Sequence, residues 1–132
     1  MPSYFSNLLN AIANELPLNI DEITWNDITF FMGGESWQFN SFADWVITDG
    51  QVMLKGCHDE DAETFLKQLI GVKILEIVPA LDKPSYDPIF LLSNTFKIRF
   101  FSTSVIDPWT FKFEENRMFV ASPSDTEWIF KQ

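Results

Sequence analysis

The sequence predicts an α+β fold in which antiparallel β-strands dominate and two short helices accompany them. Short runs rich in aromatic and β-branched residues recur along the chain and are separated by turn residues, as in β-rich domains. Only two segments carry apolar residues at helical spacing instead. Aromatic residues make up 16% of the 132 residues, which is enough to build a substantial core in a single domain, residues 1–132.

The two helices are expected at Ser3–Glu15 and Asp61–Ile70. Ser3 is a suitable N-cap for the first helix, and Pro17 helps to stop it because proline cannot continue a helix. The second helix has an apolar side, and Gly71 is well placed just past its end.

The strands are expected where aromatic and β-branched residues are enriched over runs of five to seven positions. Asp49-Gly50 lies between two such runs and predicts a tight hairpin. The expected strands are residues 28–32, 36–40, 44–48, 51–55, 72–78, 89–93, 96–101, 109–113, 118–122 and 127–131.

A faint internal repeat relates residues 3–57 to residues 61–122. Each unit reads as a helix followed by strands, with Trp37 aligned to Phe96 and Trp45 to Trp109. Two such units could pack about a pseudo-twofold axis. The alternative is chance similarity between strands that are all rich in aromatic residues.

The second unit also carries a family resemblance. Its segments "LKQLIGVKILEIVP", "IFLLSNTFKIRFFS", "DPWTFKF" and "MFVASPSDTEW" are similar to those of a group of small bacterial proteins of unknown function. Some members are thought to be immunity proteins of toxin systems, so the resemblance implies a toxin as the partner. It covers roughly residues 64–130. Pro108 and the pair Ser124-Asp125 depart from the family pattern.

The net charge of −10 lies entirely in the first half of the chain. Residues 1–66 contain one basic and eleven acidic residues, whereas residues 67–132 contain eight of each. Nucleic-acid binding is disfavoured because it needs clustered Lys and Arg. A basic protein partner would suit this charge, and solubility alone is the other explanation. The expected acidic surface comprises Asp44, Asp49, Asp59, Glu60, Asp61 and Glu63.

The stretch "KGCHDEDAETF" contains the chain's single cysteine and single histidine, Cys57 and His58. Neighbouring residues on an extended segment point to opposite faces, so we expect neither a metal site nor a Cys–His nucleophile. The acids after them are expected to start the second helix, with Asp59 or Asp61 as its cap. We therefore predict no catalytic residue, no metal and no cofactor.

The predicted function is a non-enzymatic protein-binding module of the immunity type, which would mask a basic toxin. The alternative is a self-associating structural domain, a homodimer formed through exposed strands. The chain shows neither a signal-peptide pattern nor an apolar run of roughly 18 residues, and one cysteine allows no internal disulfide, so we expect a cytoplasmic bacterial protein without membrane contact. The rings of Trp45 and Trp109 are expected in the core.

Overall fold

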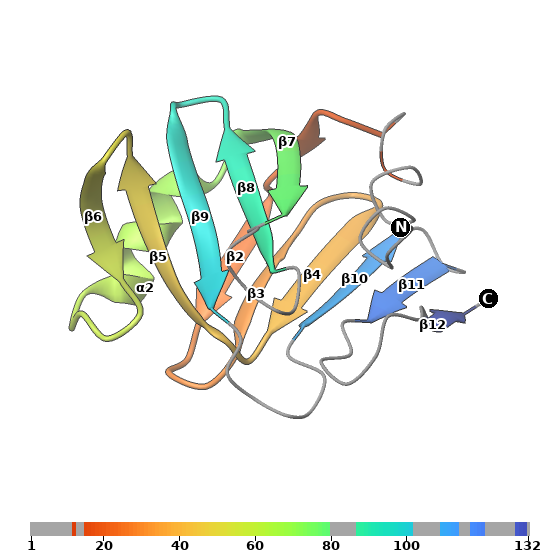
Figure 1. Ribbon diagram of the computed structural model, residues 1–132, viewed down its shortest axis with the longest axis horizontal. Coiled ribbons are helices and arrows are strands. Elements are labelled where there is room, and N and C mark those ends of the chain that lie inside the picture. The colour runs from red at the N-terminus through yellow and green to blue at the C-terminus, as the bar shows by residue number, and fades with distance from the viewer. Residues whose placement is uncertain are drawn as a thin grey trace.

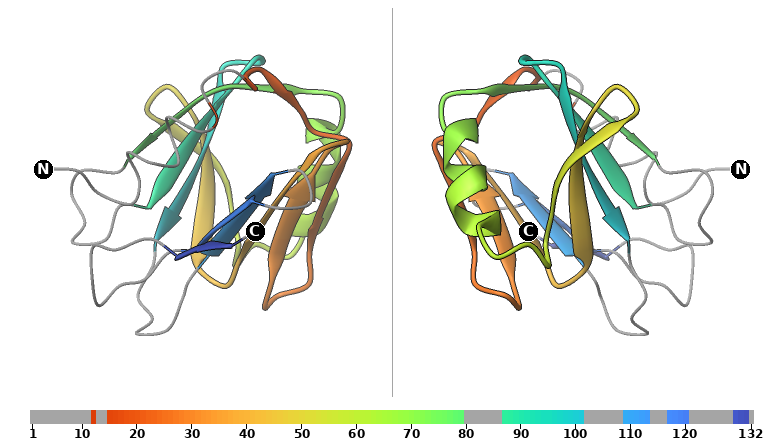
Figure 2. Two further views of the ribbon diagram at one scale, coloured as in Figure 1. Left: turned by 90° about the vertical axis from the view of Figure 1, so that its right-hand side faces the viewer. Right: turned by 90° about the vertical axis from the view of Figure 1, so that its left-hand side faces the viewer.

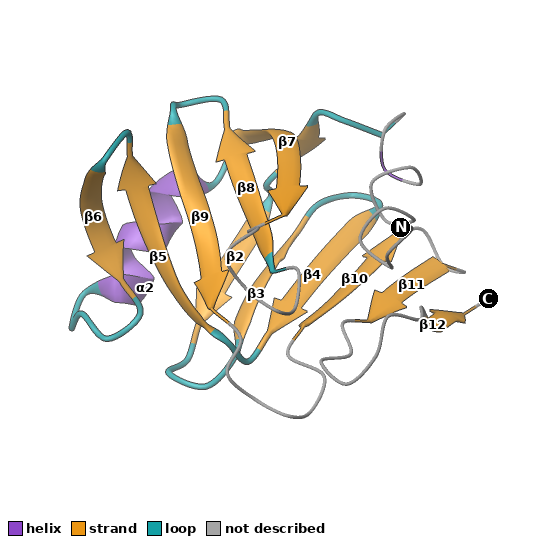
Figure 3. Cartoon of the chain, in the orientation of Figure 1, coloured by secondary structure: helices purple, strands orange, loops and turns teal. Residues whose placement is uncertain are grey.

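The computed structural model describes residues 12, 15–79, 87–101, 109–113, 117–120 and 129–131. These residues form two six-stranded antiparallel sheets and a short helix (Figures 1 and 3). In spatial order the first sheet contains β1 (Leu18–Asn19), β7 (Lys73–Pro79), β8 (Pro88–Leu92), β9 (Phe96–Phe101), β5 (Asp44–Asp49) and β6 (Val52–Gly56). The second contains β12 (Ile129–Lys131), β11 (Arg117–Val120), β10 (Trp109–Phe113), β4 (Trp37–Ser41), β3 (Phe30–Gly33) and β2 (Glu22–Trp25).

The predicted α+β class with mostly antiparallel strands is confirmed. Every predicted strand appears within a few residues of its expected position, and the runs 96–101 and 109–113 match β9 and β10. The strands β1 and β2 were missed. They are short, and β2 carries an exposed acid at its start, so neither stands out from a loop.

The two sheets lie face to face (Figure 2), and buried aromatic rings fill the space between them. Phe39 of β4 is fully buried, and its ring centroid lies 4.9 Å from that of Phe90 and 5.0 Å from that of Phe100, both in the opposite sheet. The rings of Trp45 and Trp109 are also buried, as expected. Contacts of this kind combine large apolar burial with favourable edge-to-face geometry.

The helix α2 (Ala62–Leu66) continues as a 3₁₀ turn over Lys67–Leu69, within the predicted range Asp61–Ile70. Leu66 and Leu69 are fully buried, and the helix packs against β2 and β6, at the edges of the two sheets. The other expected helix, Ser3–Glu15, lies almost entirely outside the described residues. No helix among those described is both long and apolar enough to cross a membrane.

The predicted hairpin at Asp49-Gly50 joins β5 to β6, and Gly50 adopts a positive φ of 64°. The pairing shifts by one residue along the hairpin. Ile47 lies opposite Lys55, but Thr48 lies opposite Met53, so Leu54 is an extra residue in β6. This bulge bends β6, which forms the edge of its sheet.

The two halves of the chain interlock. In the first sheet β7, β8 and β9 come from the second half and are followed in space by β5 and β6 from the first. In the second sheet β2, β3 and β4 from the first half are followed by β10 and β11 from the second. The chain therefore passes from one sheet to the other between β1 and β2, between β4 and β5, and again between β9 and β10.

Candidate functional site

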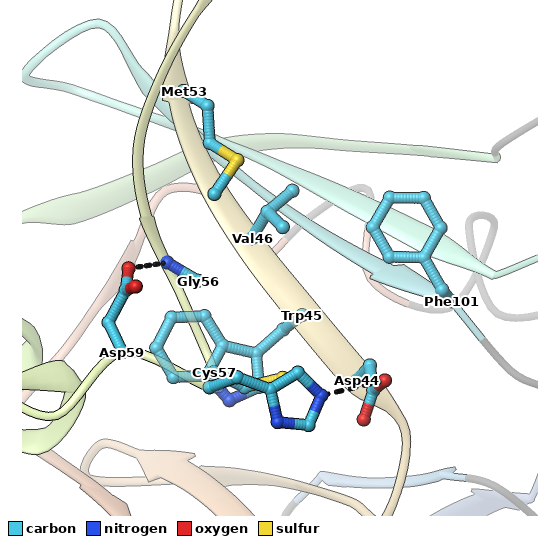
Figure 4. Close-up of a pocket in the computed structure, with 9 residues that line it drawn as sticks. Asp44, Trp45, Val46, Met53, Gly56, Cys57, Asp59 and Phe101 are labelled. Atoms are coloured by element: carbon cyan, nitrogen blue, oxygen red, sulfur yellow. Dashed lines mark hydrogen bonds and ion pairs between the residues drawn. The ribbon is translucent and has the colours of Figure 1, made fainter.

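A pocket of about 260 Å³ lies along β5 and β6 and the turn that follows β6 (Figure 4). Its apolar wall comprises Val46, Met53 and Phe101, and Trp45 lies beneath it. Its polar side comprises Asp44, Cys57, His58 and Asp59. The pocket therefore joins carboxylates, a thiol and an imidazole to an apolar surface.

Asp44, Cys57 and His58 are brought together at this polar side. One potential ligand atom from each lies within 4.8 Å of the others. His58 Nε2 lies 3.3 Å from Asp44 Oδ2. The thiol is buried, with Cys57 only 5% exposed, whereas the His58 side chain is 84% exposed.

This convergence corrects the expectation that Cys57 and His58 would point apart. They lie in a turn after β6 rather than in an extended strand, so the alternation of side chains does not apply. The backbone fixes the turn: the Cys57 N–H donates to the Trp45 carbonyl at 3.0 Å. The carboxylate of Asp59 accepts a hydrogen bond from the Gly56 N–H at 2.8 Å and closes the same turn.

Asp44 was predicted as part of an acidic surface, and not as a neighbour of Cys57. The hairpin register implied by Asp49-Gly50 could have predicted that Asp44 lies beside Cys57. A hairpin with Asp49-Gly50 at its tip sets Asp49 opposite Val52, and counting back along both strands brings residue 44 opposite residues 57 and 58.

Burial raises the pKa of the Cys57 thiol, and the nearby Asp44 carboxylate raises it further. The thiol form therefore prevails at neutral pH. Because the thiolate is the reactive species, a raised pKa makes Cys57 a poor nucleophile. The arrangement is better suited to binding than to covalent catalysis.

The predicted acidic surface divides into separate groups. Asp44 and Asp59 line the pocket, while Glu60 and Glu63 are exposed on the loop before α2 and on its first turn. Asp49 lies at the opposite end of β5, where its carboxylate accepts a hydrogen bond from Thr95 Oγ1 at 3.0 Å.

The expected helix cap is corrected too. Asp61 occupies the N-cap position, but its side chain makes no capping hydrogen bond. Its carboxylate lies 2.8 Å from Lys55 Nζ instead, and Asp59 is engaged with Gly56. Hydrogen bonding to Lys55 lowers the pKa of Asp61, and the same bond raises the pKa of Lys55.

No family model matches the chain, and comparison with curated proteins and with solved structures finds no significant match. Function must therefore be inferred from the residues of this site.

Proposed function

We propose that the protein is a non-enzymatic binding module that takes a basic side chain of a partner protein into the pocket beside β5 and β6. The observation that carries this proposal is the pairing of two carboxylates, Asp44 and Asp59, with the apolar wall. A Lys or Arg side chain has the matching form, because its stem is apolar and its end is cationic.

The charge of the surrounding surface supports the same partner. Glu60 and Glu63 are exposed close to the pocket in sequence and add negative potential there. Complementary potentials speed the encounter of two proteins and disfavour partners of like charge. The resemblance over residues 64–130 would make the partner a basic toxin, masked in the cytoplasm.

Self-association remains the alternative function, because β6 is an edge strand. Two features weigh against it. The bulge at Leu54 disturbs the regular edge that a second copy would need for strand pairing. A net charge of −10 also makes two copies repel each other.

Binding of a side-chain probe tests the proposal. N-acetyl-arginine amide, titrated into the protein and followed by NMR, should shift the amides of Asp44 and Cys57 and the methyl group of Met53. The neutral isostere N-acetyl-citrulline amide should shift them much less. Asp44→Asn should weaken arginine binding about two- to fivefold, the effect of an exposed charge pair.

Asp49→Asn is the matched control, because it removes the same charge from the other end of β5. It should leave arginine binding unchanged. Equal responses to arginine and citrulline, or shifts centred away from the pocket, would contradict the proposal. Self-association of the free protein in these samples would favour the alternative.

We also infer that the two halves are related by a pseudo-twofold. The alignment of Trp45 with Trp109 maps β5 onto β10, and continuing it maps β2, β3, β4 and β6 onto β7, β8, β9 and β11. The strand pairings β2–β3, β3–β4, β4–β10 and β5–β6 then correspond to β7–β8, β8–β9, β9–β5 and β10–β11. The register of the strands supports this symmetry. Ser41 lies opposite Trp109 in one sheet, and Phe100 lies opposite Trp45 in the other. The two pairs correspond, because the alignment relates Ser41 to Phe100 and Trp109 to Trp45.

A further inference from the structure

We propose that Asp44, Cys57 and His58 bind one divalent transition-metal ion of the zinc type. This property goes beyond the binding of a basic partner, because it depends on the thiol and the imidazole. The three side chains offer one sulfur, one nitrogen and one oxygen atom, all within 4.8 Å of one another.

The donor set selects the class of metal. Thiolate and imidazole are preferred ligands of Zn²⁺, whereas Ca²⁺ and Mg²⁺ require several oxygen ligands. Within the described residues the cluster supplies only three ligands. A zinc ion here would keep its fourth position open to the pocket or to water, as in sites with three protein ligands.

The distances fit after a small adjustment. Zn–N and Zn–O bonds of about 2.0–2.1 Å place two ligands of a tetrahedral site about 3.3 Å apart. His58 Nε2 and Asp44 Oδ2 already lie 3.3 Å apart. The most widely separated ligand atoms must approach by roughly 1 Å, given a Zn–S bond of about 2.3 Å. The side chains of His58 and Asp44 are both exposed, which gives them room to make that movement.

One ligand is held firmly while the others can adapt. Cys57 is buried, and its N–H is bonded to the Trp45 carbonyl, so the sulfur is fixed on the hairpin. Asp59 acts as a positioning residue, because its bond to the Gly56 N–H holds the turn that presents Cys57 and His58. Metal binding would displace the thiol proton to solvent and leave a thiolate on the ion.

A further observation points to a bound polar group. Trp45 lines the pocket and is fully buried, and its Nε1–H has no hydrogen-bond partner among the described residues. A buried donor without a partner is costly and rare in proteins. A thiolate bound to the metal, or a water molecule in the metal's open coordination position, would provide a hydrogen-bond acceptor on the side of the hairpin where the Trp45 Nε1–H lies.

Cobalt substitution is the sharpest test, because the chain has a single cysteine and a single histidine. The untagged protein, kept reduced with a phosphine, is titrated with Co²⁺ and followed by absorption. We expect one equivalent to produce sulfur-to-cobalt charge-transfer bands and the visible bands of tetrahedral cobalt. Zn²⁺ should then displace the cobalt and abolish both sets of bands.

Variants distinguish metal binding at this site from nonspecific attraction of the ion to the acidic surface. Cys57→Ser should abolish the charge-transfer bands, and Asp44→Asn and His58→Gln should each weaken Co²⁺ binding by more than the roughly 10–100-fold typical of an outer-shell change. The control Asp49→Asn should bind as the parent does. The charge-transfer bands report only the metal site, whereas the amide shifts caused by N-acetyl-arginine amide report only the binding of a basic side chain, so the two proposals can fail independently.

Three outcomes would overturn the metal site. One is the absence of charge-transfer bands at Co²⁺ concentrations well above that of the protein. Another is a stoichiometry of two chains per ion with a doubled mass in light scattering, which would mean that Cys57 bridges two molecules. The third is equal Co²⁺ affinity in folded Cys57→Ser and parent protein, with folding checked by circular dichroism.

Discussion

Asp59 and Asp61 lie two positions apart in the turn before α2, yet their carboxylates do different things. Asp59 binds the backbone of the turn at Gly56, whereas Asp61 pairs with Lys55 at the surface. Lys55 lowers the pKa of Asp61. That pair therefore stabilises the fold above the unfolded pKa of Asp61, and its contribution disappears as the pH falls through the lowered folded value.

At this scale we predict that Asp59→Ala lowers the free energy of unfolding by about 1 kcal/mol, because the partly buried Gly56 N–H loses its acceptor. Urea unfolding at neutral pH measures the change. Glu60→Ala is the control, since Glu60 is exposed next to it and should change stability by less than about 0.5 kcal/mol. Equal effects of the two substitutions would contradict this role of Asp59.

The helix α2 links the two sheets through its buried side. Leu66 is fully buried, and α2 contacts β2 in one sheet and β6 in the other. The same element holds one end of the turn that forms the candidate site, because that turn connects β6 to α2. Helix packing and the geometry of the site are thus coupled.

For this element we predict that Leu66→Ala lowers the free energy of unfolding by about 2–5 kcal/mol, the usual cost of truncating a buried leucine. Gln68→Ala, at an exposed position of the 3₁₀ turn that continues α2, should change the free energy of unfolding by less than about 0.5 kcal/mol. Chemical denaturation followed by tryptophan fluorescence gives both values. A small effect of Leu66→Ala would mean that α2 does not hold the sheets together.

The positions of individual strands were easier to predict than which strands lie side by side in the sheets. The alternating residues of β9 and β10 identify them as strands, because one face is buried. Which strands pair across the two halves, as β9 does with β5, depends on contacts far apart in sequence, and local patterns do not encode them. The candidate site depends on the register of the β5–β6 hairpin, which the Asp49-Gly50 turn alone does not fully determine, because the pairing shifts by one residue between Ile47 and Thr48.

At the scale of the whole molecule, the interlocked halves make one cooperative unit. The pairings β4–β10 and β5–β9 place strands of both halves side by side in each sheet. Either half alone would lose these partners and expose the aromatic core between the sheets. Residues 1–60 and 61–132 are therefore not independent domains, although the proposed repeat would divide the chain at about the same place.

We predict that fragments 1–60 and 61–132 are each unfolded alone but recover the native circular dichroism spectrum when refolded together. The break falls between the exposed residues Glu60 and Asp61, so it removes little packing. Co-purification of an affinity-tagged fragment with its untagged partner gives a second readout. Cooperative unfolding of either isolated fragment would contradict the prediction.

The exchange of strands between the sheets also sets an order of events during synthesis. β5 and β6 leave the ribosome long before β9, the strand beside which β5 must lie, and β4 likewise waits for β10. Neither sheet can be completed until most of the chain has emerged. The nascent protein therefore carries aromatic-rich strands with one open edge, such as β4 and β5, until the second half of the chain emerges, and this state exposes it to aggregation and to chaperones.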